Sequence, residues 1–432
     1  MQDLVFTTSQ ADAIDRCVNV PSNYFITGCG GTGKSTVLRE VIRRLRDKWG
    51  ADTGTVAVTA STGAAACTLS GTTLHTFGGI RLGANSVRVC IARARSDQRV
   101  RDRWAATEVL VIDEISMVAS DYISKLDAVA RALRGRSKAM GGIQIIMCGD
   151  FLQLPPVTKD CAKLFLSDWW RDARVQTILL RDSMRQSDLE FISGLNAMRM
   201  GNMPPGPLGR VLAGECSPYI EGLMSQTTKL KCLKRAADEH NMKELQKIER
   251  QELKRFYAQD WGTDPNDAFS RQCALLSVLE LKVGALVMLV RNLPHLGLVN
   301  GSTGRICRYE PRGKDGETEH VPVVNMVTTA GQPVEYVAER QEASVQDAYG
   351  GTVWSRRQVP LILAWAITIH KAQGATLDLV DVDLHGCFDV GQAYVACSRA
   401  TSLQGLKVSN FSPGCIRADP DAALFYKGLE GV

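Results

Sequence analysis

The sequence predicts an α/β fold in which parallel sheets are flanked by helices, with a small β-rich insertion in the second half of the chain. Three observations predict it. Short apolar runs in the first 155 residues are each followed at once by polar or glycine residues, and the first of them leads into a glycine-rich loop. From residue 281 to 358 the pattern changes to short strands separated by turn signals such as Asn300-Gly301.

Four apolar runs supply the strands that we expect in the first domain. They are Tyr24–Ile26, Thr55–Val58, Val109–Ile112 and Ile143–Cys148. Runs of this length, rich in β-branched residues and separated by helical patterns, are typical of buried parallel strands. Ligands of open α/β sheets bind beyond the carboxyl ends of the strands, so the polar residues that follow these runs predict a binding crevice.

The expected domain boundaries follow from these changes of pattern. We predict a first domain over residues 1–178, with a small insertion at about 78–105. Residues 179–280 and 359–432 should form a second α/β domain, because a buried strand pattern returns there, and residues 281–358 should form the β-rich insertion. Two or three domains also suit a chain of 432 residues, which is too long for one ordinary core.

Composition narrows the class of protein. Hydrophobic residues make up 45% of the chain and charged residues 22%, as in soluble globular proteins, and the net charge of +5 permits a polyanionic partner. The thirteen cysteines never take C-x-x-C spacing, which argues against a structural zinc site and for a reducing compartment. The longest apolar run, Leu361–Ile369, is about half of the ~18 residues that a membrane span needs, so we expect no membrane partner.

Residues Gly28 to Ser35 have the pattern G-x-x-x-x-G-K-S between a predicted strand and a predicted helix, which is typical of a phosphate-binding P-loop. Successive backbone N–H groups and the start of the helix would face the phosphates. Lys34 should neutralise the β- and γ-phosphates of ATP, and the hydroxyl of Ser35 should ligate Mg²⁺. The predicted nucleotide-binding residues of this loop are Gly28, Cys29, Gly30, Gly31, Thr32, Gly33, Lys34, Ser35 and Thr36.

Three polar residues at neighbouring strand ends complete the predicted chemistry. Asp113 and Glu114 end an apolar run, where Asp113 would face the metal ion and Glu114 the attacking water. Gln153 follows the next run and would sense the γ-phosphate or orient the same water. Each also has a simpler structural explanation, as solvated carboxylates at a strand end and as a glutamine in a surface loop.

Aromatic, hydroxyl and basic residues indicate a track for nucleic acid. His75 and Phe77 follow a run of threonines, and His370-Lys371 follows the buried strand of the second half. Stacking combined with phosphate contact suits a single strand of nucleic acid. Core packing of Phe77, helix capping by the threonines, and solvated faces for the basic clusters Arg88–Arg103 and Lys229–Arg235 remain alternatives.

Together these motifs resemble the Pif (petite integration frequency) family of superfamily 1 DNA helicases, from Gln10 to Leu406. In the first half the resemblance is carried by Gly28–Ser35, Thr59–Ala66, Gly71–Phe77, Asp113–Met117 and Gly149–Val157. In the second half it is carried by Arg185–Asp188, Lys282–Ala285, Val287–Leu289, Leu298–Gly301, Thr368–Thr376 and Gly391–Ala400. This set of motifs is far more specific than the P-loop alone.

The resemblance implies two RecA-like domains, with ATP and Mg²⁺ bound between them and single-stranded DNA crossing both. It implies that Gln10 reads the adenine base, that Arg185 and Arg399 are arginine fingers, and that the insertion at 78–105 separates DNA strands. The implied catalytic residues are Lys34, Glu114, Gln153, Arg185 and Arg399. Asp113 and Ser35 are the implied metal ligands. The residues expected to contact DNA are Thr59, Ser61, Thr62, His75, Phe77, Asn300, His370, Lys371, Gln392, Tyr394 and Ser398.

The implied activity is 5′-to-3′ translocation on single-stranded DNA, with unwinding of tailed duplexes and of folded DNA such as G-quadruplexes. The implied role is genome maintenance: replication, repair, recombination, and upkeep of telomeres or mitochondrial DNA. We expect a location in the nucleus, the mitochondrion or both, and a monomer, because one chain would supply both halves of the ATP site. Two rivals stay open: a RecD-like helicase or a translocase that does not separate strands, and an ATP-gated remodelling factor with negligible turnover.

Cys29 departs from the family pattern, because relatives often carry a smaller and less reactive residue there. A thiol near the start of a helix is expected to have a lowered pKa and to oxidise readily. Oxidants would then inhibit ATP hydrolysis. The alternative is that Cys29 is an inert small filler.

Overall fold

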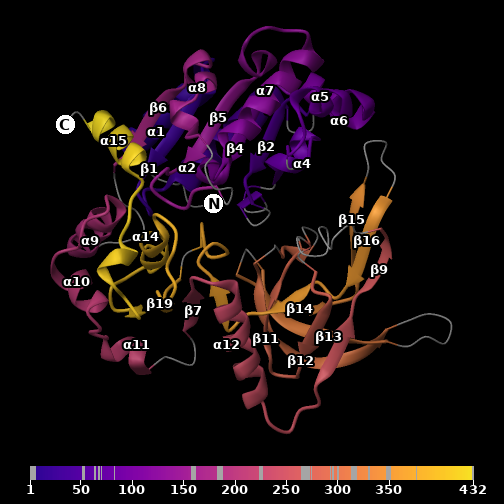
Figure 1. The fold of residues 1–432 in the computed structure, drawn as a ribbon, viewed down its shortest axis with the longest axis vertical. Coiled ribbons are helices and arrows are strands. Elements are labelled where there is room, and N and C mark those ends of the chain that lie inside the picture. The colour runs from indigo at the N-terminus through magenta and orange to yellow at the C-terminus, as the bar shows by residue number, and fades with distance from the viewer. Residues whose placement is uncertain are drawn as a thin grey trace. The chain divides into compact units, whose positions relative to one another are not determined.

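The structure is a computed structural model that assigns the chain to two compact units. One unit comprises Met1–Cys232 together with Ala372–Val432, and the other comprises Leu233–Lys371 (Figure 1). The residues that it describes are 6–50, 54–62, 65–66, 69, 71–81, 83–156, 162–181, 188–222, 227–263, 273, 275–291, 293, 296–298, 301–312, 319–328, 331–346, 352–375 and 377–430.

The described part of the first unit contains a six-stranded sheet in the order β3-β2-β4-β5-β1-β6, in which each recorded pairing is parallel. Its strands are β1 (Tyr24–Gly28), β2 (Val56–Ala60), β3 (Thr72–Thr73), β4 (Val109–Asp113), β5 (Gln144–Gly149) and β6 (Gln176–Leu180). The four predicted strands correspond to β1, β2, β4 and β5. The predicted parallel α/β sheet is therefore confirmed.

Side chains of this sheet alternate between two apolar cores, one on each face. Leu110 and Ile112 of β4 enter one core, whereas Val109 and Val111 enter the other. The core around Val111 is completed by α1 (Thr8–Asn19) and α2 (Lys34–Trp49). The opposite core is completed by α4 (Leu74–Gly78), α5 (Val87–Ser96), α6 (Gln98–Ala106), α7 (Ser120–Arg134), α8 (Asp168–Asp172) and α15 (Pro420–Glu430).

A smaller group of parallel strands lies in the same unit. β19 (Val380–Asp383) pairs in parallel with β7 (Thr228–Lys231) on one side and with β20 (Leu406–Ser409) on the other. The helices of this part are α9 (Leu189–Arg199), α10 (Gly206–Leu212), α11 (Pro218–Gly222) and α14 (Gln392–Cys397). Short 3-10 helices are η1 (Ile115–Met117), η2 (Ala139–Gly142), η3 (Leu164–Leu166) and η7 (Pro413–Cys415).

The second unit contains the β-rich region predicted at residues 281–358, and the recorded pairings within this unit are antiparallel. A five-stranded sheet has the order β14-β13-β12-β11-β17, beside a three-stranded sheet β15-β16-β9 and the pair β10-β8, all within the described residues. The elements are α12 (Lys234–Lys247), β8 (Lys254–Tyr257), β9 (Gln259–Gly262), β10 (Val278–Leu281), β11 (Leu286–Leu289), β12 (Thr303–Arg312), β13 (Glu319–Val327), β14 (Pro333–Val337), β15 (Gln341–Gln346), β16 (Thr352–Gln358), β17 (Leu361–Leu363) and β18 (Ala366–Thr368).

The unit boundaries bear on the predicted domains in two ways. The β-rich unit begins at Leu233, earlier than the predicted insertion at 281. The predicted second α/β domain includes residues 420–430, and these form α15, which packs into the core of the first sheet. The division of the α/β part into two domains at residue 178 stays a prediction.

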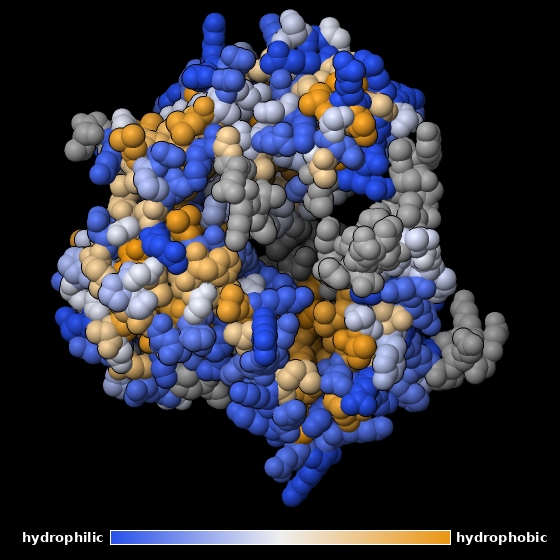
Figure 2. Space-filling view, viewed as in Figure 1, coloured by the Kyte–Doolittle hydropathy of each residue, from blue (hydrophilic) through white to orange (hydrophobic). Residues whose placement is uncertain are grey.

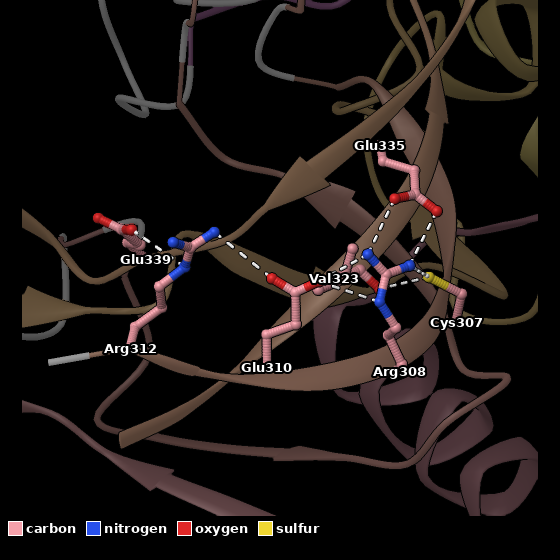
Figure 3. Close-up of polar contacts among 7 residues, drawn as sticks. All are labelled: Cys307, Arg308, Glu310, Arg312, Val323, Glu335 and Glu339. Carbon is pink, nitrogen blue, oxygen red and sulfur yellow. Dashed lines mark hydrogen bonds and ion pairs between the residues drawn. The ribbon is translucent and has the colours of Figure 1, made fainter. Parts of the chain in front are cut away.

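Alternating charged residues on β12 form an exposed network across the five-stranded sheet. The pairing of β12 with β13 shifts register between Ile306 and Arg308. After this shift Arg308, Glu310 and Arg312 lie on one face of the strand, because successive members are two residues apart. Arg308 pairs with Glu310 at 2.6 Å and with Glu335 at 2.8 Å, and Arg312 pairs with Glu310 at 3.4 Å (Figure 3). Solvent screens such pairs, so we expect them to fix side-chain arrangement more than overall stability.

Polar and apolar side chains are interspersed over the visible face of the protein (Figure 2). The larger exposed apolar side chains include Val87 and Val89 on α5, which are 41% and 48% exposed. Among the described residues, no helix combines the length and the apolar character that crossing a bilayer requires.

Tyr426 joins α15 to two strand ends of the first sheet. Its hydroxyl shares a 2.6 Å hydrogen bond with Thr27 Oγ1 and accepts a 3.1 Å bond from the backbone N–H of Phe151. Its ring lies 4.2 Å from the guanidinium carbon of Arg199, and its side chain is fully buried. The neighbouring Phe425 packs against Phe165, with ring centroids 4.9 Å apart.

We therefore expect Tyr426→Phe to lower the free energy of unfolding by about 1–3 kcal/mol, because it leaves buried polar groups of Thr27 and Phe151 without a partner. Chemical denaturation checks this value. Tyr219→Phe is the matched control, since Tyr219 is 55% exposed and should lose almost nothing. Equal stability of the two variants would show that the buried hydroxyl bonds contribute no net stability.

Candidate functional site

The P-loop connects the end of β1 to the start of α2, and its glycines are required by close approach and by backbone conformation. A Cβ at Gly28 would lie 2.4 Å from the carbonyl oxygen of Leu180 on β6, so no larger residue fits. Gly33 precedes α2 with a φ of 78°, in the left-handed region that favours glycine. Gly28 and Gly33 therefore allow the tight loop that this segment forms at the edge of the sheet.

Lys34 places its ammonium group inside this loop. Its Nζ donates to the carbonyl oxygens of Gly28 at 2.7 Å and Cys29 at 2.8 Å. Thr32 is buried and donates from Oγ1 to the carbonyl of Cys29 at 3.0 Å, whereas Ser35 is exposed at the first turn of α2. An ammonium held only by carbonyl oxygens can exchange them for phosphate oxygens, so the loop fits a nucleotide phosphate chain.

Asp113 and Glu114 lie at the end of β4, on the same edge of the sheet as the P-loop. Burial, together with the charge of Glu114, raises the pKa of Asp113 to about 7, while Lys34 acts in the opposite direction. A buried carboxyl of this kind fits a ligand of Mg²⁺, because a nearby cation favours its charged form. The structure thus brings three predicted site residues together at one strand edge.

Glu114 has an unusual backbone that directs its side chain. Its φ of 51° and ψ of 45° lie in the left-handed region, and its N–H donates to Asp113 Oδ1 at 2.9 Å. For a residue other than glycine this conformation costs on the order of 1–3 kcal/mol and is common at functional sites. Its carboxylate Oε2 accepts a 2.8 Å hydrogen bond from Nε2 of Gln373.

Gln153 lies in the loop after β5, where a buried ion pair holds the backbone. The carboxylate of Asp150 accepts two hydrogen bonds from Arg199, at 2.9 and 2.8 Å, and Asp150 accepts from the N–H of Leu152 at 3.1 Å. Although burial opposes ionisation, Arg199 holds the pKa of Asp150 below its usual range. Gln153 itself is buried, 5% exposed, which rules out the surface-loop alternative for it.

Helix α14 contacts the P-loop. The N–H of Gly30 donates to the hydroxyl of Tyr394 at 2.7 Å, and a Cβ at Gly30 would lie 3.3 Å from that of Ser398. At the end of α14, Arg399 is buried and donates from Nη2 to Ser398 Oγ at 2.8 Å and from Nε to the carbonyl of Val395 at 2.9 Å. The predicted finger Arg399 therefore lies just after the helix that touches the phosphate-binding loop, whereas Arg185 lies outside the described residues.

Gln10 is held against the P-loop by a capping box at the start of α1. Its Oε1 accepts from the N–H of Thr7 at 3.1 Å, and its Nε2 donates to the carbonyl of Thr32 at 3.2 Å. The side chain is 3% exposed. This position beside the loop is compatible with adenine recognition, which stays a prediction.

Five residues expected to contact DNA are buried in the structure. They are Thr59, Phe77, Gln392, Tyr394 and Ser398. Thr59 donates to the carbonyl of Val111 at 2.7 Å, and Phe77 packs on Trp104 with ring centroids 4.7 Å apart. The amide oxygen of Gln392 accepts from the N–H of Phe388 at 3.0 Å. Phe77 is thus a core residue, as the alternative explanation predicted. The burial of all five side chains does not support direct contact with DNA, and their DNA contacts stay predictions.

The other expected DNA contacts are more accessible. Ser61 and Thr62 are half-buried at the end of β2, next to Asp113, whose carbonyl accepts from the N–H of Ser61 at 3.1 Å. His75 packs on Tyr122, and burial lowers the pKa of its imidazole. In the other unit, His370 is half-buried and Lys371 is exposed. Asn300 lies outside the described residues.

Cys29 does not have the expected electrostatic environment. Burial raises the pKa of its thiol, and the opposing effects of Arg199 and Lys34 are smaller. The expected lowering of its pKa is therefore wrong, because desolvation of the thiolate outweighs the positive end of the helix. The inert-filler alternative is the one that the structure favours.

Two contacts of the site were not predicted from the sequence. Gln373 belongs to the motif Thr368–Thr376, but only the folded chain shows that it contacts Glu114, 259 positions away. Tyr394 was assigned to DNA, whereas the structure places its hydroxyl on the P-loop. Neither contact has a local sequence signal, since each joins segments that are distant in the chain.

Comparison with known proteins agrees with this architecture. Residues 5–204 match the PIF1-like helicase family, and residues 268–309 match the 2B domain of DNA helicase Pif1. The ATP-dependent DNA helicase PIF1 of Homo sapiens is 42% identical over 96% of this chain and 63% of its own length. The ATP-dependent DNA helicase RRM3 of Saccharomyces cerevisiae is 32% identical over 99% of this chain and 68% of its own length. The chain thus spans just under two thirds of the PIF1 relative.

Solved structures show the same fold. The Pif1 helicase of Candida albicans superposes with a TM-score of 0.89 at 36% identity, covering 99% of both chains. The Pif1 helicase from Bacteroides in complex with ADP-AlF3 and ssDNA superposes with a TM-score of 0.75 at 26% identity, covering 99% of this chain and 98% of that one. The predicted fold class, RecA-like parallel sheets with an added β-rich region, is confirmed. The chain belongs to the PIF1-like helicase family.

Proposed function

We propose that the chain hydrolyses ATP with Mg²⁺ and uses the free energy to move 5′-to-3′ along single-stranded DNA and to separate duplex strands. The observation that carries the proposal is the convergence of Lys34, Asp113 and Glu114 at one strand edge, with α14 against the P-loop. The names of the relatives, ATP-dependent DNA helicases, and the Bacteroides complex with ADP-AlF3 and ssDNA support it.

The arrangement suggests a role for each side chain. Lys34 would bind the β- and γ-phosphates, and Ser35 with Asp113 would hold Mg²⁺, which neutralises charge on the phosphates. Glu114 would accept a proton from the attacking water, and Gln153 would orient that water. Arg399, and Arg185 by resemblance, would stabilise the charge that develops on the γ-phosphate.

Translocation would come from an affinity for single-stranded DNA that depends on the bound nucleotide. Because ATP would touch both the P-loop and α14, its binding would favour one arrangement of these segments and hydrolysis would release it. Ser61, Thr62, His75, His370 and Lys371 are the candidates for DNA contact that retain accessible surface. A role in genome maintenance in the nucleus or mitochondrion, unwinding of G-quadruplexes, and a monomeric active form belong to the same proposal.

Strand displacement tests the proposal. With ATP and Mg²⁺, the chain should release the strand from a duplex that carries a 5′ single-stranded tail and not from one that carries a 3′ tail. Release only from the 3′-tailed duplex would contradict the polarity. DNA-stimulated hydrolysis without release from either would favour a translocase or remodelling factor.

Lys34→Ala should lower kcat for ATP hydrolysis by about 10²–10³-fold, because it removes the positive charge that faces the transferring phosphoryl group. Phosphate release in the presence of single-stranded DNA measures the loss. Lys48→Ala, at the far end of α2, is the matched control and should keep wild-type turnover. A loss shared by both variants would point to α2 stability and not to phosphate binding.

Glu114→Gln should bind ATP and DNA with wild-type affinity but turn over about 10²–10⁴-fold more slowly, because an amide cannot accept the proton of the water. The amide oxygen can still accept from Gln373, so the local structure should persist. Nucleotide and DNA titrations, together with steady-state turnover, separate the two effects. Near-wild-type turnover would remove Glu114 from the mechanism.

A further inference from the structure

Gln373 lies against the carboxylate that the proposed mechanism uses as general base. Its Nε2 donates to Glu114 Oε2 at 2.8 Å. A hydrogen bond from an amide to an ionised carboxylate is shorter and stronger than one between neutral groups, so it fixes the direction of the carboxylate. The side chain comes from the segment just before β19, far along the chain from β4.

The other end of the Gln373 amide is unsatisfied. Its Oε1 is buried and has no hydrogen-bond partner among the described protein groups. A buried acceptor without a partner is unfavourable and is usually met by a water molecule or a ligand. The oxygen therefore marks a place where a donor is expected beside Glu114.

Among the described residues, Glu114 Oε1 accepts no hydrogen bond, so this oxygen can accept one from such a donor. Its Oε2 is bound by Gln373, and its N–H is bound by Asp113. The residue after Gln373 is Gly374, with a φ of 81°, and even a Cβ placed there would stand 3.6 Å from Glu114 Oε1. Because Gly374 has no Cβ, it leaves the space beside Glu114 Oε1 that a side chain at this position would contact.

We propose that Gln373 is a positioning residue for hydrolysis, whose Nε2 orients Glu114 while its Oε1 accepts a hydrogen bond from the attacking water. This inference rests on the proposed ATPase function. The water has two protons, so two acceptors fix it: Glu114 Oε1 for the proton that leaves and Gln373 Oε1 for the one that stays. Gln373 neither gains nor loses a proton.

The chemical step then balances in atoms and electrons. The water oxygen forms a bond to the γ-phosphorus, and the bond from that phosphorus to the bridging oxygen breaks, with its electron pair passing to ADP. One water proton passes to Glu114 and is later released to solvent. The contribution of Gln373 is orientation, which affects the rate of the step and not the affinity for ATP.

Gln373→Met tests the inference, because methionine keeps the volume and length of the side chain but has no amide. We expect kcat with single-stranded DNA to fall about tenfold or more, with KM for ATP and Kd for DNA unchanged within about twofold. Gln246→Met, on the exposed face of α12, is the matched control and should behave as wild type. A wild-type kcat for Gln373→Met would show that the side chain only packs, and would overturn the inference.

A double-mutant cycle separates positioning from a general structural defect. Because Gln373 and Glu114 would act on the same water, the loss of single-turnover phosphate release in the variant with both substitutions should be smaller than the two single losses predict when combined. Additive losses would overturn the inference, because they would mean that Gln373 acts independently of the base. A wild-type chain without DNA-stimulated phosphate release would overturn the proposed function itself, whereas an active wild type with fully active Gln373→Met would overturn only the role of Gln373.

Discussion

The buried ion pair between Asp150 and Arg199 ties together the segments that meet around the P-loop. Both side chains are almost fully buried, and the carboxylate accepts two hydrogen bonds from the guanidinium. Removing one partner of such a pair leaves an uncompensated charge in the interior, at a cost of about 3–5 kcal/mol. Asp150 follows β5 and Arg199 ends α9, so the pair joins the first sheet to a helix residue 49 positions further on.

This constraint extends to the nucleotide site through Tyr426. The ring of Tyr426 covers Arg199, and its hydroxyl reaches Thr27, which directly precedes Gly28 of the P-loop. The C-terminal helix α15 thus acts on the same strand ends that carry the predicted chemistry. Substitutions far from the phosphates can therefore alter the site by shifting β1 or the loop after β5.

The predicted site residues at the carboxyl ends of β1 and β4 are held in place by contacts with their neighbours. Lys34 is placed by carbonyls of its own loop, Glu114 by Asp113 and Gln373, and Gly30 by Tyr394. Each contact limits the positions available to a reacting group, and such preorganisation is where enzymes gain most of their rate. A strained backbone at Glu114 fits the same picture, because its cost is offset by a fixed direction of the carboxylate.

The sequence by itself determined the parallel sheet, the P-loop, the carboxylates at the end of β4 and the β-rich region. These features depend on local signals: short apolar runs, glycines at positions where the backbone accepts no larger residue, and polar residues directly after apolar runs. Only the tertiary structure decided that the hydroxyl of Tyr394 contacts the P-loop and that Phe77 is buried in the core. It also decided that α15 joins the first core and that Gln373 contacts Glu114. The sign of the pKa shift at Cys29 was also decided there, since desolvation depends on the packing of distant segments around the thiol. Long-range contacts of this kind have no periodic or compositional trace in the chain, because they depend on how separate elements pack.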